Sequence, residues 1–389
     1  MPAKLPATMT PKRTILLDGD SGSPQQARLG AALAGRGWRV FVLDAPAVVA
    51  QIGREFNQEC EHLRGMPTWT GPLRTRHLQR LARENAIDVV HLNFLWPKHR
   101  AWSDDLTGPA YVATAWGSDL NEEVFKRPLR HVRTVSEVLR RASAVTADSA
   151  PLLAKAVARM GDNPAPRQIV YWSVDLPRFD PAAHAAATLR FREQLGIAPG
   201  TRVLLSPRQA KPHYHIDRII AGFAASGWAA DGVLVLKLHG KKEEAAYVAR
   251  LLDQARVLGV HDRVRLAPRL SYEDLPGLYA LADAAVSLPE ADGVPSTFLE
   301  LMALAVPIVA SDLPAYAGVL TADDNALLVP SGDAGGLVQA LDRLHRDAEL
   351  GARLTRNGSA WVRTHGDWQQ AVEQWIALYE HAIVTPRPV

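Results

Sequence analysis

The sequence predicts an α/β protein made of two doubly wound parallel sheets, each covered by helices. A chain of 389 residues is long for one domain, so two domains are expected. Short apolar runs of strand length alternate with segments of helical spacing, which is the pattern of parallel strands joined by helices. This alternation occurs twice and is interrupted by an irregular stretch at 173–200. We therefore expect two Rossmann-like domains facing each other across a cleft that binds the ligand.

The first domain is assigned to residues 1–180. Apolar residues at helical spacing occur at 23–36, which ends near Gly37, and at 73–84. The strand-like runs of this domain are 13–18, 39–43, 87–92, 110–114 and 144–147.

The second domain is assigned to residues 181–366 and begins with a short helix at 188–195. Its strand-like runs are 202–206, 232–238, 264–266, 284–288, 307–310 and 327–329. Its further helices are expected at 217–225, 245–259, 272–281 and after Ser296. The tail, 367–389, contains an amphipathic helix that is expected to return to the first domain; its aromatic residues are Trp368, Trp375 and Tyr379.

The composition, with 47% hydrophobic and 22% charged residues, is that of an ordinary globular protein. No apolar run approaches the roughly 20 residues needed to cross a bilayer, and residues 1–13 lack the apolar segment of a secretory signal. The single cysteine, Cys60, leaves no internal disulfide or cysteine-based zinc cluster. The histidines show no H-E-x-x-H or comparable ligand spacing. We expect a cytoplasmic protein with no structural or catalytic zinc and no prosthetic group.

The charge is unevenly distributed along the chain. Residues 1–180 carry 24 basic and 18 acidic side chains, whereas residues 181–389 carry 20 and 23. The basic excess of the first domain favours anionic partners or peripheral contact with the inner face of a membrane. A chance asymmetry of the solvated surface is an equal alternative. No cluster of Lys and Arg is typical of nucleic-acid binding, so no nucleic-acid partner is expected.

The most informative segment places two carboxylates, Asp292 and Glu300, eight positions apart across a strand-to-helix turn. Residues 284–288 are apolar and β-capable, which indicates the end of a buried strand. Asp292 and Gly293 then favour a turn. The spacing of the two acids therefore predicts that both lie near the carboxyl edge of the second sheet.

A helix is predicted to follow this turn. Ser296 or Thr297 is expected to cap it, with Glu300 in its first turn. The free N–H groups and partial positive charge of a helix N-terminus suit an anion such as a diphosphate, and carboxylates accept hydrogen bonds from sugar hydroxyls. Taken singly, Asp292 could be a turn former and Glu300 a charge favoured by the helix dipole. Their spacing together favours a sugar-nucleotide site.

A basic loop follows the strand at 202–206 and is also expected at the carboxyl edge of the second sheet. Arg208 can bind phosphate in a bidentate manner, and Lys211 supplies a point charge. Two such cations would neutralise the charge on a departing nucleoside diphosphate in place of a metal. A surface salt bridge is the alternative, and it competes more strongly for Lys211 than for Arg208.

A loop rich in glycine and serine, at 18–25, follows the first strand. Its glycines allow a close approach of the backbone, and the next helix N-terminus could receive a phosphate or an acceptor. Its spacing is not G-x-G-x-x-G, so we predict no NAD site. Gly22 and Ser23 are the candidate residues, and a plain strand-to-helix turn is the alternative.

Three more candidates lie at the ends of strands in the first domain. Trp116 and Asp119 follow the strand at 110–114, and His91 ends the strand at 87–92. Trp116 could stack on a sugar or lipid, or pack at the edge of the core. Asp119 could face a ligand or cap the next helix. His91 could reach an acceptor, although a core histidine satisfied by the backbone is the commoner outcome.

These motifs resemble those of the retaining glycosyltransferases with the GT-B fold in glycosyltransferase family 4, also called glycosyltransferase group 1. The stretch from Asp292 to Glu300 resembles the family's E-x7-E motif, with Asp in the first position. Residues 300–311, ELMALAVPIVAS, are similar to E-A-M-A-x-G-x-P-V-V-A-S, and residues 325–333, NALLVPSGD, are similar to N-G-L-L-V-P-x-G-D. The similarity extends over most of 200–345 and is looser in the first half of the chain.

The resemblance implies a donor domain, an acceptor domain and a role for several residues. Glu300 would bind the ribose hydroxyls of a nucleoside-diphosphate sugar, and Asp292 would bind the hydroxyls of the sugar. Lys211 lies three residues after Arg208, whereas the family's Lys lies five residues after its Arg, where this chain has His213. The resemblance also implies transfer with retention and without a metal. The residues assigned to donor binding are Glu300, Gly293, Val294, Pro295, Ser296, Gly22 and Ser23, and those on the acceptor side are Trp116, Asp119 and His91.

Two other functions remain open at this stage. The Asp at 292, the Trp at 116 where many members have His, and the shifted Lys211 would all fit a non-catalytic subunit that binds a sugar nucleotide. An epimerase of the same fold would need a nucleotide sugar and no acceptor. For a transferase, the acceptor is a glycan, a lipid-linked carrier or a small molecule.

Overall fold

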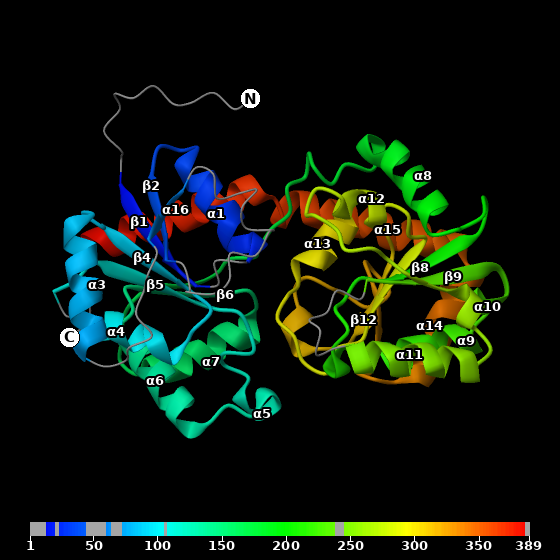
Figure 1. Cartoon of the computed structure of the whole chain (residues 1–389), viewed down its shortest axis with the longest axis horizontal. Helices are drawn as coiled ribbons and strands as arrows, with labels where there is room; N and C mark the ends of the chain where they lie inside the picture. Colours follow the sequence, from blue (N-terminus) through cyan, green and yellow to red (C-terminus); the bar gives the residue numbers. More distant parts are fainter. Residues whose placement is uncertain are drawn as a thin grey trace. The chain divides into compact units, whose positions relative to one another are not determined.

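The computed structural model describes residues 13–19, 23–43, 60–63, 72–104, 107–237 and 245–385. The chain forms two compact units (Figure 1). Unit 1 consists of Met1–Val170 together with Val372–Val389, and unit 2 consists of Tyr171–Ala371. Within the described ranges, no helix is both long enough and apolar enough to cross a membrane.

The described part of unit 1 contains a seven-stranded parallel sheet in the order β3-β2-β1-β4-β5-β6-β7. The strands are β1 (Thr14–Asp18), β2 (Arg39–Leu43), β3 (Glu61–Leu63), β4 (Val89–Asn93), β5 (Ala110–Ala115), β6 (Ala144–Ala147) and β7 (Arg167–Ile169). The sequence predicted five of them and missed β3 and β7, which have only three residues each. The chain order reverses between β1 and β4, so the carboxyl ends of these two strands lie at the topological switch point.

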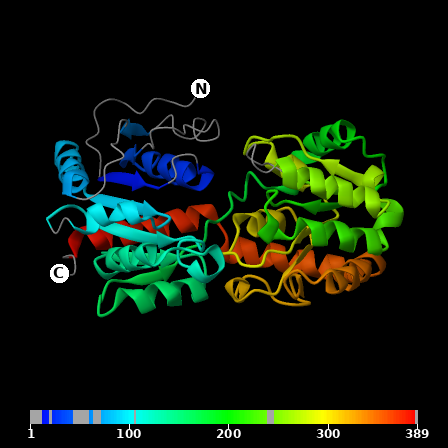
Figure 2. The ribbon, with the colours of Figure 1, turned by 60° about the horizontal axis from the view of Figure 1, so that its bottom comes forward.

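Helices cover both faces of this sheet. The helices of unit 1 are α1 (Pro24–Ala34), α3 (Pro72–Glu84), α4 (Arg100–Ser103), α5 (Glu122–Phe125), α6 (Leu129–Arg140), α7 (Ala150–Met160) and α16 (Trp368–Val384), with a 3-10 turn, η2 (Pro97–His99). In Figures 1 and 2, α1 and α16 lie on one face, and α3, α4, α6 and α7 lie on the other. The second layer buries an apolar core in which Trp102 of α4 and Leu139 of α6 pack with Leu92 of β4. Burial of this apolar surface is the main force that holds the layers together.

Helix α16 completes the opposite face of unit 1. Its Trp375 ring lies 4.7 Å from the His91 ring of β4, centroid to centroid, and its Tyr379 ring lies 5.8 Å from that of Trp38. All four side chains are buried. At its ends, ion pairs join Arg36 to Glu373 at 2.7 Å and Arg13 to Glu380 at 3.5 Å.

Unit 2 contains a six-stranded parallel sheet, counted over its described residues, in the order β10-β9-β8-β11-β12-β13. The strands are β8 (Arg202–Ser206), β9 (Gly232–Leu236), β10 (Val264–Leu266), β11 (Ala284–Ser287), β12 (Ile308–Ser311) and β13 (Leu327–Val329). Each corresponds to a strand predicted from the sequence. All except β10 are largely apolar and buried. The order reverses between β8 and β11, which places the ends of these strands at the switch point of unit 2.

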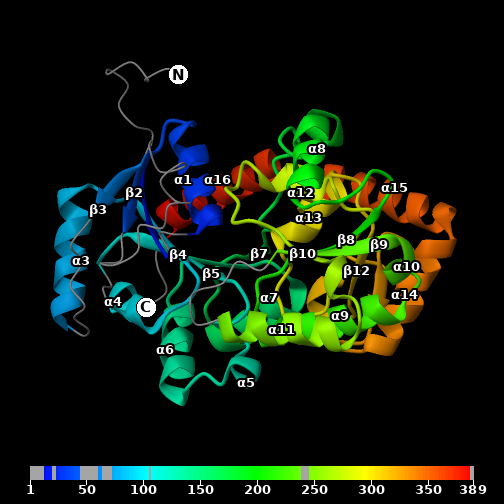
Figure 3. The same ribbon diagram turned by 45° about the vertical axis from the view of Figure 1, so that its right-hand side comes forward.

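The helices of unit 2 lie on both faces of its sheet (Figure 3). They are α8 (Ala185–Gln194), α9 (Ile216–Ala225), α10 (Trp228–Asp231), α11 (Ala245–Val257), α12 (Leu275–Tyr279), α13 (Ser296–Ala303), α14 (Ala334–Arg346) and α15 (Ala348–His365). The 3-10 turns are η3 (Pro181–His184), η4 (Pro212–Tyr214), η6 (His261–Arg263) and η7 (Pro314–Tyr316). Helices α9, α11 and α14 share one core with alternate strand residues such as Leu236 and Val286. Helices α12, α13 and α15 lie on the other face.

The packing of α9 against α14 depends on a glycine. A Cβ on Gly222 would lie 2.5 Å from Cδ2 of Leu337, and both residues are buried. The two helices therefore approach more closely than a larger residue would allow. This contact fixes α9, whose N-terminal end leads back to the Arg208 loop.

Candidate functional site

The carboxyl edge of the unit 2 sheet brings together the basic loop and the carboxylate turn. The loop after β8 carries Arg208, which is 9% exposed, and the turn after β11 carries Asp292. Because β8 and β11 are neighbours in the sheet, the loops that follow them meet at the same edge. The sequence predicted both residues at this edge.

Arg208 and Asp292 form a direct ion pair. The distance from Nη2 of Arg208 to Oδ2 of Asp292 is 2.7 Å, although the residues are 84 positions apart. The hydroxyl of Tyr316 donates to the same Oδ2 at 3.3 Å, and the backbone N–H of Gly293 donates to Oδ1 at 3.1 Å. The guanidinium carbon of Arg208 also lies 4.2 Å from the ring centroid of Tyr214, which is cation–π geometry. Neither tyrosine was predicted from the sequence to belong to the site.

Burial controls the electrostatics of this pair. It raises the pKa of Asp292 more than Arg208, Tyr316 and Gly293 lower it. Burial opposes the charge on Arg208, yet Asp292, Tyr214 and Tyr316 together raise the pKa of Arg208 above its ordinary value. The guanidinium is therefore a permanent cation, and Asp292 balances its charge when no ligand is bound.

Glu300 lies on α13, next to the carboxylate turn, and is 3% exposed. The prediction that Ser296 or Thr297 caps this helix is wrong. Pro295 occupies the N-cap position, and no side chain caps the helix. Ser296 is already the first helical residue, which places Glu300 in the second turn instead of the first.

The residues between the two acids lie together at this edge, as their spacing requires. Gly293 and Val294 are buried, and Pro295 and Ser296 are half-buried. The carbonyl of Pro289 accepts hydrogen bonds from the hydroxyls of Ser311 at 2.9 Å and Ser331 at 2.8 Å. These bonds tie the start of the turn to the ends of the next two strands and fix the path of the backbone toward Asp292.

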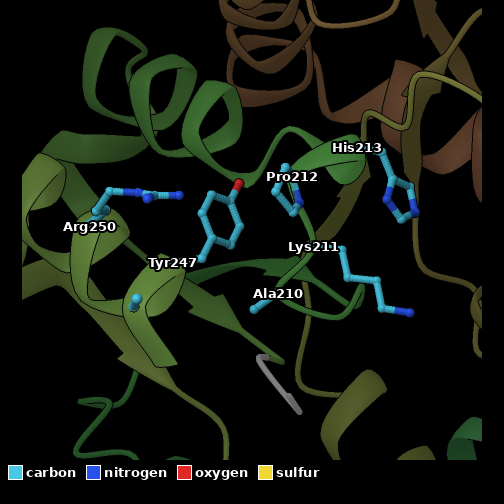
Figure 4. A pocket seen from close by; sticks show the side chains of 7 residues that line it. Ala210, Lys211, Pro212, His213, Tyr247 and Arg250 are labelled. Carbon is cyan, nitrogen blue, oxygen red and sulfur yellow. The ribbon is translucent and has the colours of Figure 1, made fainter. Parts of the chain in front are cut away.

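Lys211 lies farther along the same loop and lines a pocket of about 460 Å³. The lining residues are Ala210, Lys211, Pro212, His213, Ala246, Tyr247 and Arg250. Figure 4 shows the Lys211 side chain pointing away from Tyr247 and Arg250. Burial, with Lys211 and Arg208 nearby, lowers the pKa of His213 to about 4, so this imidazole is neutral at pH 7.

The structure places His91 in the core of unit 1. Its side chain is fully buried, and both ring nitrogens have partners. The Nε2 atom lies 2.6 Å from Oγ1 of Thr114, and the Nδ1 atom lies 2.6 Å from the hydroxyl of Tyr379. Burial lowers the pKa of His91 to about 3. These contacts are those of a core histidine that anchors α16, which was the alternative interpretation of this residue.

Asp119 is buried and holds the loop after β5. Its carboxylate accepts hydrogen bonds from the backbone N–H groups of Leu95 at 2.8 Å, Trp116 at 3.1 Å and Gly117 at 2.9 Å. Burial nevertheless raises the pKa of Asp119. The adjacent Trp116 is half-buried. Asp119 thus orders the backbone that presents Trp116 at the carboxyl edge of unit 1.

The loop after β1 is only partly described. Gly22 lies outside the described residues. Ser23 is buried and occupies the N-cap position of α1, but its hydroxyl donates to Oε1 of Gln25 at 3.0 Å instead of capping the helix.

Asp18, at the end of β1, has a role that was not predicted from the sequence. Its carboxylate is buried and binds Nζ of Lys98 and Nε1 of Trp102, each at 2.8 Å. Burial raises the pKa of Asp18, but Lys98 and His99 more than offset this and hold it well below its usual range. Asp18 is therefore a structural anion that connects β1 with η2 and α4. Across the described ranges, no cluster of three or more His, Cys, Asp and Glu side chains could hold a metal ion.

Two doubly wound parallel sheets in one chain, with charged loops at the edge of the second, define the GT-B class of fold. The structure of the Anabaena protein HepE in complex with UDP superimposes with a TM-score of 0.80 at 17% identity, covering 95% of this chain and 99% of that one. The predicted GT-B fold is confirmed. Residues 188–361 match the family model of the glycosyl transferases group 1, and the chain carries a domain of this family.

Two curated relatives are similar over longer stretches. The D-inositol 3-phosphate glycosyltransferase of Salinispora tropica is 27% identical over 316 residues, which is 77% of this chain and 65% of the relative. A GDP-mannose-dependent alpha-(1-6)-phosphatidylinositol monomannoside mannosyltransferase of Mycobacterium tuberculosis is 26% identical over 203 residues, which is 50% of this chain and 51% of the relative. The chain thus spans about two thirds of the length of the first relative and half of the second.

Proposed function

We propose that this protein is a retaining glycosyltransferase that moves a sugar from a nucleoside-diphosphate sugar to an acceptor hydroxyl without a metal ion. The observation that carries the proposal is the Arg208–Asp292 pair at the switch point of unit 2, next to Glu300 on α13. In this proposal, the pair supplies a permanent cation for the leaving diphosphate and a carboxylate for the hydroxyls of the sugar. It also lies within the part of the chain that matches the group 1 family.

The reaction requires stabilisation of negative charge on the leaving group. The bond between the anomeric carbon and the β-phosphate oxygen breaks, and its electron pair leaves with the diphosphate. The acceptor oxygen forms the new bond to the anomeric carbon, and its proton passes to the leaving diphosphate. Arg208 would stabilise the charge that develops on the diphosphate, because a buried cation acts strongly in a site that excludes water. Lys211 would add a second, more exposed charge.

Asp292 and Glu300 would hold the two sugars of the donor. Asp292 already accepts from Arg208, Tyr316 and Gly293, but two carboxylate oxygens offer about four acceptor positions. One position is therefore left for a hydroxyl of the transferred sugar. Glu300 would accept from the ribose hydroxyls. The backbone from Gly293 to Ser296 would lie against the donor.

The acceptor is proposed to bind at unit 1, near Trp116. The names of the two relatives suggest an inositol phosphate or a phosphatidylinositol derivative as the first acceptors to test. Asp119 would contribute by ordering the backbone of the loop that carries Trp116. Gly22 and Ser23 remain candidates for the donor phosphates.

Peripheral contact with an anionic membrane surface is a further part of the proposal. The N-terminal end of α6 exposes Leu129, at 62%, beside Arg130 and Arg133. An apolar side chain flanked by cations is suited to an anionic lipid surface. Co-sedimentation with vesicles of anionic lipid should be lost in Leu129→Glu, and equal binding of this variant would refute this contact.

The activity is tested by incubating the protein with UDP-, GDP-, ADP- and dTDP-sugars, with and without D-inositol 3-phosphate and phosphatidylinositol, in the presence of EDTA. We expect a glycosylated acceptor and one equivalent of nucleoside diphosphate from one of the donors. Product NMR should show the anomeric configuration of the donor. Transfer that needs an added divalent cation would refute metal independence.

The same assay separates the two alternative functions. A donor whose sugar changes without an acceptor would indicate an epimerase. Binding of a nucleoside diphosphate without turnover over the whole acceptor panel would favour the non-catalytic subunit. The non-catalytic alternative is worth testing because of the Arg208–Asp292 pair. Asp292 can bind the transferred sugar only if one of its hydrogen-bond acceptor positions is free.

A further inference from the structure

A second lysine, Lys237, lies at the edge that carries the Arg208–Asp292 pair. It is the first residue after β9, and its backbone N–H donates to the carbonyl of Ser206 at 3.0 Å. Ser206 ends β8, and Arg208 follows two residues later. Lys237 therefore lies one strand away from the Arg208 loop, at the carboxyl ends of the strands.

The strand pattern places the Lys237 side chain on the face of the sheet that α13 covers. Leu236, one residue earlier, belongs to the core shared with α9, α11 and α14. Successive side chains of a strand point to opposite faces, so Lys237 faces the side of Glu300. The charges of Glu300 and Arg208 both act on the Lys237 ammonium, which agrees with this placement.

The Lys237 ammonium is partly buried, and its side chain makes no hydrogen bond or ion pair with any residue in the described ranges. Burial lowers its pKa to about 8, against the opposing effect of Glu300. A desolvated cation without a close anion is unfavourable. The hydroxyl of Ser287, at the end of β11, is also buried and lacks a hydrogen-bond partner in this part of the structure. By strand alternation, Ser287 lies on the same face as Lys237.

The other cations of this edge leave the charge of a diphosphate unbalanced. Arg208 is already paired with Asp292 at 2.7 Å. His213, which stands where the family has its Lys, is neutral at pH 7 because its pKa is about 4. Lys211 is half-buried, lines the adjacent pocket and points away from Tyr247 and Arg250. Arg208, whose charge is shared with Asp292, and Lys211 are the charged groups that remain, so a ligand with two or more negative charges would gain from a further cation.

We propose that Lys237 binds the diphosphate of the nucleotide donor and replaces the lysine that the Arg208 loop lacks at position 213. The proposal rests on the proposed function, because it assigns a residue to the same donor site. Lys237 would keep its proton throughout the reaction and stabilise the electron pair that leaves with the diphosphate. Ser287 would donate a hydrogen bond on the same face.

The test compares the wild-type protein with Lys237→Met, Lys237→Arg and Arg346→Met. Arg346 is 75% exposed on α14, so its substitution controls for the loss of one positive charge far from the site. Calorimetric titration measures the affinity for UDP and GDP and for the nucleosides uridine and guanosine. Lys237→Met should weaken diphosphate binding at least about tenfold, as loss of a charge-assisted contact does, and leave nucleoside binding unchanged. Lys237→Arg should retain most of the diphosphate affinity.

Thermal unfolding without ligand provides a second readout. Because the substitution removes a partly buried cation that forms no ion pair within the described residues, Lys237→Met should unfold at the same temperature as the wild type or higher. A lower Tm together with equal loss of diphosphate and nucleoside binding would show a structural role and overturn the inference. Equal diphosphate affinity in wild type and Lys237→Met would overturn it while the proposed function stands. If the wild type binds none of the diphosphates, both fail.

Discussion

The ionisable groups at the carboxyl edges of the two sheets differ in how fully the protein itself supplies their hydrogen-bond and ion-pair partners. In unit 1, Asp18 binds Lys98 and Trp102, Asp119 accepts from three backbone N–H groups, and His91 contacts Thr114 and Tyr379. In unit 2, Arg208 is paired with Asp292, and the Lys237 side chain has no hydrogen-bond or ion-pair partner within the described residues. Groups satisfied by the protein stabilise the fold, whereas unsatisfied cations are available to a ligand. The comparison predicts that substitutions in unit 1 change stability and substitutions in unit 2 change ligand binding.

The largest effect is expected for Arg208→Ala. The variant loses the buried cation that we propose stabilises the leaving diphosphate, so kcat/KM should fall about 10²–10³-fold, similar to the loss of one preorganised charge-stabilising donor. It also leaves Asp292 buried without its cation, which should lower stability. The double variant Arg208→Ala/Asp292→Ala should regain stability but not activity. Recovery of activity in the double variant would contradict the proposed role of Arg208.

Glu300→Ala should weaken the binding of nucleoside diphosphates by about 10- to 100-fold, which corresponds to the loss of hydrogen bonds to a charged group. Asp292→Ala should instead reduce transfer while binding of the diphosphate changes less, because Asp292 is assigned to the transferred sugar. Titration calorimetry and initial rates separate the two effects. Unchanged affinity in both Glu300→Ala and Arg208→Ala would refute the donor site.

Tyr379→Phe should lower the free energy of unfolding by about 1–3 kcal/mol, because it leaves Nδ1 of the buried His91 without its partner. Denaturant titration measures the change. Diphosphate affinity should stay at the wild-type value, since both residues belong to unit 1. A loss of diphosphate affinity without a loss of stability would contradict the prediction that substitutions in unit 1 change stability and not ligand binding.

The smallest effect is a pH dependence of stability. The pKa of His91 is about 3 in the folded protein and about 6.5 in an unfolded chain. The unfolded state therefore binds more protons between these values, and His91 makes the free energy of unfolding fall with decreasing pH, by about 1 kcal/mol per pH unit at most. His91→Gln should reduce this slope between pH 6 and pH 4. An unchanged slope would show that His91 accepts a proton without unfolding.

The sequence was sufficient for the parts of the fold that depend on continuous apolar runs. The strands β8, β9 and β11 follow from such runs, and their ends locate Arg208 and Asp292. The strands β3 and β7 were missed because three residues with polar members give no periodic signal. The helix cap was wrong because Pro295 precedes Ser296, and proline fixes the backbone of the N-cap residue.

The pairing within the site could not be predicted. Arg208 and Asp292 are 84 positions apart, and no local pattern shows that they contact each other. The same reasoning that selected Arg208, a basic residue just after a buried strand, applies to Lys237 and could have found it. For His91 and Asp119 the residue types were compatible with either a ligand or the core. Their partners in the fold, such as Tyr379 of α16, decided between these roles.

The position of α16 in unit 1 affects how the chain folds during synthesis. Unit 1 contains the first described strand and the last helix, and Tyr379 of that helix contacts His91, 288 positions earlier. The ribosome therefore makes all of unit 2 before it releases the helix that covers Trp38 and His91. At about 5–20 residues per second, roughly 200 intervening residues take roughly 10–40 s. During this interval the nascent unit 1 lacks the helix that covers Trp38 and His91, so unit 1 begins to form before unit 2 and is completed after it.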